Sequence, residues 1–393
     1  MTWWSRLTHE LRTLILGPYT TGDPALARIF GGAPTVSGEP VTVARAASLT
    51  AVWSCVNLIA GSIATMPLLL YRRVDEDRER AVEHPLYDVL RTRPNPVQSV
   101  VSFWESMTVA LLLRGNAFAT ITRDDDARPR ALWYVNPDRV QIDVTKAGRL
   151  KYRVTNPDGT QTTIPADGML HICGPMSDDG YCGRSVISTF RETLGLGLAL
   201  ERYGAEFFSN AATPKGVLTA PNRLSREAQE RLVATLEDRH GSPGRRHRTM
   251  VLEEGVKFEP VGVSHEDSQF VDVRRFTTEE IARIFSVPAS MIGAETKGSL
   301  TYSNAETRAL DFLKFCLGPW LARIEAACNF SLVSPLERRQ LYVEFLPDAL
   351  LATDTAGRYA AYKTGLESGF LTVEEVRRRE NLPALPERIP QVG

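Results

Sequence analysis

Hydrophobic and polar positions follow two different periods along the chain. Between Ser48 and Thr65 apolar residues recur every three to four positions, which predicts a helix with one buried face formed by Val52, Cys55, Val56, Ile59 and Ile63. Between Ala117 and Cys173 the period changes to two, which predicts a small antiparallel β-module of several hairpins. The helical period returns after Ser185. The pattern therefore predicts an α+β fold.

Shorter elements surround this β-module. The pattern predicts strands at 68–71 and 341–346, a charged turn at 75–78, and helices at 85–91, 99–113 and 348–366. Gly115 follows the second of these helices, and Thr372 to Glu375 has the capping pattern of a short basic helix. Residues 17–47 are rich in Gly, Pro, Thr and Ala, so we expect an extended arm there.

Two long helical segments enclose a compact insert. The first runs from Ser185 to Asn210 and contains Gly195, Gly197 and Gly204, whose cost in helix propensity suggests close helix packing. The second begins at Ser264 and ends at Val287-Pro288. Residues 214–263 combine short strand patterns at 216–218, 249–252 and 256–260 with a helix at 225–240. We interpret them as an α+β knob on two helical stalks.

A small-residue loop joins the second stalk to another long helix. That helix starts with the capping pattern Ser303 to Glu306, and its apolar stripe is Leu310, Leu313, Leu317, Leu321, Ile324 and Cys328. Pro319 lacks a backbone N–H and clashes with the preceding turn, so we expect a kink at Gly318-Pro319. Two rods joined by a loop suit the positioning of a surface against something large.

Composition and charge limit the possible functions. With 46 Lys and Arg against 47 Asp and Glu, the net charge of −1 argues against a protein that coats DNA with a globally positive surface. No apolar run reaches the roughly 18 residues that a membrane span needs. The five cysteines are odd in number and lack C-x-x-C spacing, which indicates a reducing compartment and no metal. No cofactor is predicted.

Three local patterns have a functional and a structural interpretation. His171 and Cys173 share one strand face like a ligand pair, but no third ligand lies nearby, and we favour a structural role. The acidic run Asp124 to Asp126 resembles a metal site, and we favour a solvated hairpin turn. The N-terminal residues Trp3, Trp4, Leu7, Leu11, Leu14 and Ile15 share a helical face, which favours a docking helix over a membrane-surface helix.

The loop after Pro288 resembles a nucleotide-binding P-loop only in part. Gly293 and Gly298 have the glycine spacing of a P-loop, but Ser299 stands where the phosphate-binding lysine must be, and no strand precedes the loop. The sequence also lacks G-x-G-x-x-G after a strand, H-E-x-x-H and G-x-S-x-G, and its six histidines are scattered. We therefore predict that the chain is not an enzyme, and in particular not an ATPase.

Two binding features remain. The loop around Lys297 suits sliding contact with a phosphate backbone, because such contacts position DNA without reading its bases; its candidate DNA-facing residues are Thr296, Lys297, Gly298, Ser299, Thr301 and Tyr302. The basic turn Arg245, Arg246, His247 and Arg248 on the knob is a candidate docking site for nucleic acid or an acidic partner. Taken alone, each is more commonly an ordinary surface loop or solvated turn.

Several segments together resemble the portal proteins of tailed bacteriophages and gene-transfer particles. They span Ala46 to Pro383, and their order along the chain is specific although each is weak alone: AVWSCVNLIA at 51–60, HPLYDVL at 84–90, RPNP at 93–96, FW at 103–104, RGNAF at 114–118, FFSN at 207–210 with GVL at 216–218, and RIFSVPASMIG at 283–293. The resemblance implies a portal-type subunit with an α/β wing, a two-helix stem, a clip, a tunnel loop and a long kinked helix.

The resemblance also implies a division of the chain. Residues 1–45 form an N-terminal arm, 46–184 the wing, 185–213 and 264–288 the stem helices, and 214–263 the clip. Residues 289–303 form the tunnel loop, 304–330 the kinked helix, 331–382 the C-terminal wing part with a short or absent crown, and 383–393 a tail. These boundaries are expectations from the family.

The family implies a function and partners as well. Its members form a homo-oligomeric ring, typically of twelve subunits, at one capsid vertex of the virion, and double-stranded DNA passes through the ring during packaging and ejection. The implied partners are the terminase large subunit, a head–tail adaptor and the major capsid protein, with assembly in the host cytoplasm and no membrane insertion. A near-neutral charge suits a channel in which DNA must slide, because strong phosphate neutralisation would make a salt-sensitive clamp.

Two rival functions stay open from the sequence. One is a nucleic-acid-processing enzyme that uses Asp124 to Asp126 and the 293–303 loop, although the missing P-loop lysine weighs against it. The other is a peripheral membrane scaffold anchored by Trp3, Trp4 and Leu7.

Overall fold

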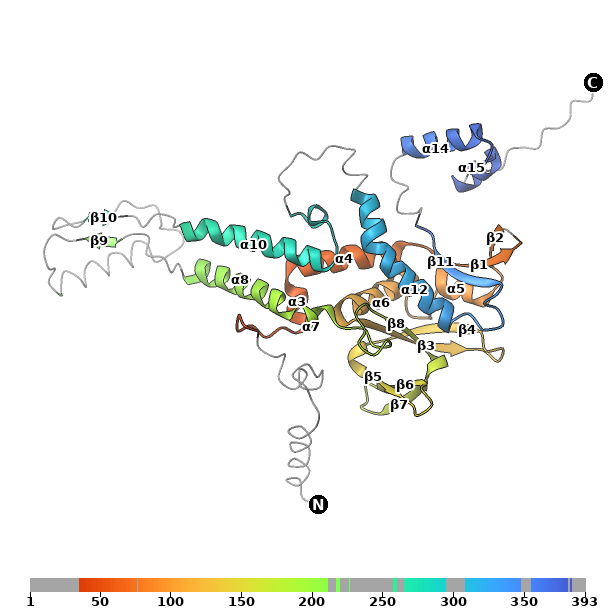
Figure 1. Cartoon of the computed structure of the whole chain (residues 1–393), viewed down its shortest axis with the longest axis horizontal. Helices are drawn as coiled ribbons and strands as arrows, with labels where there is room; N and C mark the ends of the chain where they lie inside the picture. The colour runs from red at the N-terminus through yellow and green to blue at the C-terminus, as the bar shows by residue number, and fades with distance from the viewer. Residues whose placement is uncertain are drawn as a thin grey trace, which may run out of the picture.

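The computed structural model describes residues 35–75, 77–210, 217–219, 226, 257–259, 265–294, 308–347, 355–380 and 382–383. Within these ranges, helices and antiparallel sheets form a body from which two long helices extend side by side (Figure 1). The predicted mixture of helices and strands is confirmed.

Two helices form the centre of the body. α4 spans Thr50–Thr65, and all five residues of its predicted stripe are buried. α6 spans Val100–Arg114 and packs along α4. It ends as predicted at Gly115, whose φ of 76° is a left-handed conformation that a residue without Cβ adopts easily. These two helices carry the largest buried side chains of the core, including Trp104 and Phe103.

A three-stranded sheet in the order β11-β1-β2 borders this core. β1 spans Leu68–Val74, three residues longer than the predicted 68–71, and β11 spans Leu341–Phe345, close to the predicted 341–346. α5, at Pro85–Arg91, packs beside β1. The predicted charged turn at 75–78 is wrong in part, because Asp77–Arg80 forms strand β2. Its charges suit an exposed edge strand, and Arg78 forms an ion pair with Glu344 of β11.

The predicted antiparallel β-module consists of two three-stranded sheets. The first has the order β4-β3-β8, and the second has the order β5-β6-β7. A separate cluster of buried side chains joins them, with the Phe118 and Tyr152 rings 5.9 Å apart at its centre. The strands are β3 (Asn116–Arg123), β4 (Pro129–Val135), β5 (Val140–Val144), β6 (Leu150–Thr155), β7 (Gln161–Pro165) and β8 (Met169–Cys173), with short 3₁₀ turns η1 (Pro137–Arg139) and η2 (Ala166–Gly168).

The two long helices are α8 and α10. The helix predicted from Ser185 to Asn210 is divided, because Phe190 leaves helical geometry between α7 (Val186–Thr189) and α8 (Arg191–Asn210). α10 spans His265–Ile284 and packs against α8. Beyond the far ends of this pair, β9 (Val217–Thr219) pairs with β10 (Lys257–Glu259), which are the described strands of the predicted knob.

The predicted extended arm is wrong for its last residues. Val43–Ser48 forms helix α3, because the Thr42 hydroxyl accepts a hydrogen bond from the Arg45 amide and caps the first turn. Residues 35–42 lie on α8, where Gly195 faces Thr35 so closely that a Cβ would collide. Gly195 therefore allows close contact with this segment rather than with another helix. Gly197 faces Leu49 and, on α10, Thr277.

The helix that follows the predicted tunnel loop contains a π-helical segment, η4 (Phe312–Leu317), directly before α12 (Gly318–Ser331). A π-turn holds more residues than an α-turn, so the buried stripe moves. Leu317, Leu321, Ile324 and Cys328 are buried as predicted, but upstream Phe312 and Cys316 are buried whereas Leu310 is 47% exposed. The irregularity lies next to the predicted site of the kink, where Pro319 removes a helical donor.

The chain closes with a short helical pair. α14 spans Thr355–Glu367, and the first residues of the predicted helix, 348–354, lie outside the described ranges. α15 spans Val373–Arg379, and its predicted capping box is confirmed, because the Thr372 amide donates to Glu375 and the Glu375 amide donates to the Thr372 hydroxyl.

Candidate DNA channel and docking site

The residues predicted to face DNA or a partner lie outside the described ranges. Thr296, Lys297, Gly298, Ser299, Thr301 and Tyr302 fall within 295–307, and Arg245, Arg246, His247 and Arg248 fall within 227–256. The structure does describe the elements to which both segments are attached. These are the ends of the tunnel-loop segment at Ala294 and Arg308, and the α8–α10 pair that carries the knob.

We call the described residues on either side of segment 295–307 its two roots. The root on the α10 side is a tight turn. Ser286 has a φ of 56°, and the Val287 amide donates to the Ala282 carbonyl at 2.9 Å, which ends α10. The 3₁₀ turn η3 (Ala289–Ile292) follows, and Gly293 with a φ of 78° caps it. Because Val287 is buried in the core, the chain leaves the stem helix at a fixed place.

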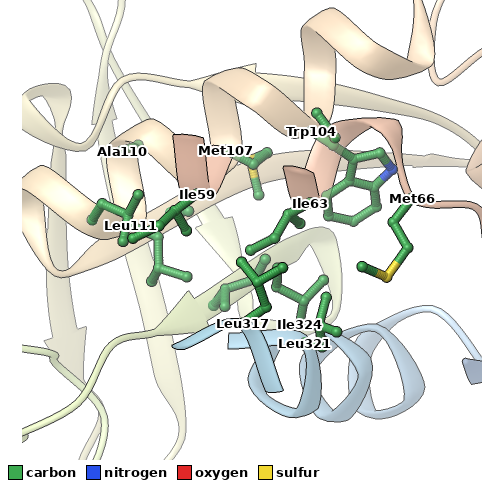
Figure 2. Close-up of a cluster of buried hydrophobic side chains, with 14 of the residues drawn as sticks. Ile59, Ile63, Met66, Trp104, Met107, Ala110, Leu111, Leu317, Leu321 and Ile324 are labelled. Carbon is green, nitrogen blue, oxygen red and sulfur yellow. The ribbon is translucent and has the colours of Figure 1, made fainter. Parts of the chain in front are cut away.

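The root on the other side is the helix η4–α12. Figure 2 shows Leu317, Leu321 and Ile324 facing Ile59 and Ile63 of α4. At its far end, Asn329 donates to the Val343 carbonyl and accepts from the Val343 amide, so that its side chain completes the free edge of β11. Glu325 accepts from the Phe345 amide at the same edge. This helix is therefore held along its length.

A direct bond links the two roots. The Cys316 thiol in η4 donates to the Phe285 carbonyl at the end of α10, with the sulfur and oxygen 3.4 Å apart. Burial raises the pKa of Cys316 to about 12, so the thiol keeps its proton and remains a donor at neutral pH. Both ends of the loop segment thus belong to one packed unit around α4.

The charged face of α10 is largely self-neutralising. Arg275 lies 3.5 Å from Glu279, and Arg283 lies 3.6 Å from Glu280, each one helical turn apart. Such exposed pairs contribute little to stability, but they balance the surface charge. A balanced stem does not bind phosphate strongly, which suits a surface along which DNA slides.

The stem also exposes apolar side chains that the sequence did not single out as contacts. Leu196 and Tyr203 of α8 are 43% and 54% exposed, and Val273 and Phe276 of α10 are 43% and 55% exposed. The apolar period of the sequence does not show which of these side chains stay exposed. Apolar side chains gathered on one exposed face are typical of surfaces that contact another protein or a membrane.

The features that suggested other chemistry have structural roles. The Asp124 carboxylate accepts from the amides of Asp126 and Arg128 and pairs with Arg130 at 2.8 Å, so it closes the hairpin turn. The two ring nitrogens of His171 lie 3.1 Å from Asn116 and 3.2 Å from Tyr152. Burial lowers the pKa of His171 to about 4.

Among the described residues, no group of three or more His, Cys, Asp and Glu side chains is arranged to hold a metal ion. No helix in the described part of the chain is long and apolar enough to cross a membrane. The membrane and docking alternatives for residues 3–15 fall on residues outside the described ranges.

Comparison with known proteins decides the family. Residues 50–381 match the family model described as phage portal protein. The chain belongs to the phage portal protein family. The probable portal protein of Streptomyces phage phiC31 is 31% identical over 374 residues, covering 93% of this chain and 81% of that portal. The portal protein of Enterobacteria phage HK97 is 29% identical over 393 residues, covering 98% and 90%.

Solved portal-like structures match the fold. A chain in the virion of a native gene transfer agent particle aligns with a TM-score of 0.64 and 25% identity, covering 93% of this chain and 100% of that one. A chain in the neck of an empty gene transfer agent particle, computed with C6 symmetry, has a TM-score of 0.64 and 26% identity, with the same coverage. The portal family, inferred from scattered segments of sequence, is therefore confirmed, as is the portal-type fold.

Proposed function

We propose that this chain is the subunit of a portal ring at one vertex of a virus or gene-transfer particle, through which double-stranded DNA is packaged and ejected. The observation that carries the proposal is the family match over residues 50–381. The neck structure with C6 symmetry supports a ring of identical subunits, since cyclic symmetry repeats one interface around an axis.

The geometry gives the ring a physical basis. The α8–α10 pair forms a rigid stalk, and the loop segment 295–307 leaves the body between two roots that are packed on α4. In the proposed ring this loop faces the channel, and the knob at the end of the stalk docks other proteins. The mechanism requires positioning and sliding rather than bond cleavage, so we propose a non-enzymatic role.

The expected partners follow from this role. We propose that the terminase large subunit docks on the clip residues Arg245, Arg246, His247 and Arg248 during packaging, and that a head–tail adaptor replaces it afterwards. The major capsid protein surrounds the wing. Assembly takes place in the host cytoplasm, and twelve subunits per ring is the number that the family suggests.

Particle mass tests the ring. The purified full-length protein is expected to form particles that are a multiple of the subunit mass of 43.6 kDa and that show a central channel in negative-stain images. Monomers alone, at every concentration and in assembled particles, would contradict the proposal.

A charge reversal tests the channel-facing loop. Lys297→Glu is expected to lower the amount of DNA packaged or retained without preventing ring assembly, because it puts a negative charge where phosphates pass. Lys146→Glu, on the exposed turn between β5 and β6, is the matched control and should package normally. Normal packaging in Lys297→Glu particles would contradict the assignment of Lys297 to the channel but would not contradict the proposed ring.

A further inference from the structure

Three glycines meet where the body joins the stem. Gly115 caps α6, Gly174 follows β8, and Gly183 lies in the connector that leads to α7. The Gly174 amide donates to the Gly115 carbonyl at 2.8 Å, and a Cβ on any of the three would collide with backbone atoms of another of these segments. The absence of side chains therefore lets three backbone segments approach closely.

This junction sets two cysteine-containing segments beside each other. Gly183 lies against Gly174, and the Arg184 amide donates to the Pro175 carbonyl at 3.4 Å, so 182–184 runs alongside 173–175 in the same direction. Cys173 and Cys182, which precede the two glycines, are consequently neighbours. A Cβ at Gly183 would lie 2.8 Å from the Gly174 Cα, so the two backbones approach as closely as the ~4.4–6.8 Å Cα separation of a disulfide requires.

Asn116, in strand β3, lies close to both cysteines. It stands opposite Cys173 in the β3–β8 register, and its side-chain nitrogen lies 3.6 Å from the Cys182 sulfur. The same amide group donates to the Gly183 carbonyl and accepts from the Gly183 amide. Asn116 is therefore a direct neighbour of both cysteine residues, of Cys173 across the β3–β8 ladder and of Cys182 through its side chain.

These two cysteines also differ from the others in access. Cys173 and Cys182 are partly exposed, whereas Cys55, Cys316 and Cys328 are buried. A metal ion does not fit this pair with His171 as third ligand, because both ring nitrogens of His171 already have hydrogen-bonding partners. The chemistry open to two accessible, neighbouring thiols is oxidation to a disulfide.

We propose that Cys173 and Cys182 form a reversible disulfide, a modification site for small disulfide oxidants such as glutathione disulfide. One thiolate attacks the oxidant and releases one glutathione thiol, and the second thiolate then attacks the mixed disulfide and releases the other. Two protein thiols are oxidised, one glutathione disulfide is reduced to two glutathione thiols, and the two protein protons are transferred to them.

The bond would tie the connector to β8. It closes a loop of the eight residues 174–181, directly before Ser185, whose hydroxyl donates to the Leu113 carbonyl at the end of α6. The oxidised state therefore fixes the point at which the chain leaves the body for the stem. Burial raises the pKa of both thiols, so the reaction should be slow at neutral pH and faster as the pH rises.

Peptide mapping of the full-length protein tests the proposal independently of the ring. The protein is incubated with glutathione disulfide, remaining thiols are alkylated under native and then denaturing conditions, and the digest is analysed by mass spectrometry. Trypsin leaves both cysteines in the peptide 154–184, which should become lighter by two hydrogen atoms; cleavage before Asp178 or Asp179 should not separate the halves until a reductant is added. Cys55, Cys316 and Cys328 should remain thiols.

Two variants complete the test. Cys173→Ser should leave a glutathione adduct on Cys182 and no internal bond, and Cys55→Ser should form the bond like the parent protein. Separate glutathione adducts on Cys173 and Cys182 in the parent protein, or both thiols unchanged after prolonged incubation at pH 8.5, the ordinary pKa of a cysteine thiol, would overturn the proposal.

Discussion

α4 and α10 both place apolar side chains in the core of the body, but the chain buries the apolar side chains of the two helices to very different extents. All five residues of the α4 stripe are buried, whereas on α10 Ile281 and Ala282 near the body are buried and Val273 and Phe276 are about half exposed. α8 repeats the contrast, since Leu194 and Leu198 near the body are buried and Leu196 and Tyr203 are not.

This difference in burial distinguishes a body that a single subunit stabilises by itself from a stem, the α8–α10 pair, whose apolar side chains are left for other subunits to cover. The body around α4 has a complete core and fixes both roots of the loop segment 295–307. The stem is anchored to the body at one end, and we infer that neighbouring subunits cover its exposed apolar residues. The body should accordingly respond to mutation as a monomer does, and the stem should respond through assembly.

The largest effect is expected in the body. Ile59→Ala removes a fully buried side chain of α4 and should lower the free energy of unfolding by about 2–5 kcal/mol, because a cavity remains in a close-packed core. Denaturant unfolding measures it. Trp53→Ala on the same helix, where Trp53 is 63% exposed, should change the unfolding free energy far less. Equal losses in the two variants would contradict the division between body and surface.

Acid should weaken the body through His171. The fold lowers the pKa of this residue from its ordinary 6.5 to about 4, so the unfolded chain binds the proton more readily. Neutral His171 contributes fully to the free energy of unfolding above pH 6.5. This contribution falls by up to roughly 3 kcal/mol as the pH decreases towards 4. Unfolding measured between pH 7 and 4 should therefore have a smaller slope in His171→Gln. If the free energy of unfolding had the same pH dependence in the parent protein and in His171→Gln, the proposed role of His171 would be contradicted.

The stem should respond through assembly. Phe276→Asp places a charge on the exposed apolar surface and should weaken ring formation about tenfold or more, about 1.4 kcal/mol, with the unfolding free energy of the monomer nearly unchanged. Mass photometry across a dilution series measures the effect. Val82→Asp, on the body and 62% exposed, is the control and should assemble normally. Undisturbed assembly of Phe276→Asp would place the subunit contact elsewhere.

The smallest effect is expected from the charged face of the stem. Arg275→Gln removes the pair with Glu279, and an exposed pair at this spacing contributes only about 0.3–0.5 kcal/mol. Thermal unfolding should show this small change at low salt and a still smaller one at high salt, because salt screens an exposed ion pair. A loss several times larger would mean that this face is not merely solvated.

Local signals in the sequence predicted the regular elements well. α5 has its predicted bounds, because Pro85 occupies the first turn and His84 accepts a hydrogen bond from the Leu86 amide. Gly115 marked the end of α6, and Thr372 and Glu375 marked the start of α15. These features depend on residues only a few positions apart, which a single sequence displays directly.

Features that depend on distant residues could not be predicted. The π-helical segment before Pro319 moves the buried stripe from Leu310 to Phe312. No residue near this segment provides a sequence signal that predicts π-helical geometry. The neighbourhood of Cys173 and Cys182 requires Gly115, Gly174 and Gly183 to meet. The candidate residues of the loop and clip, from Thr296 to Tyr302 and from Arg245 to Arg248, and the domain boundaries stay predictions.

A three-dimensional reconstruction of the purified assembly tests the central claim most directly. We predict a ring in which Phe276 and Leu196 are covered by neighbouring subunits and the segment containing Lys297 faces the channel. A ring in which these apolar side chains face solvent, with Lys297 on the outer surface, would contradict the account.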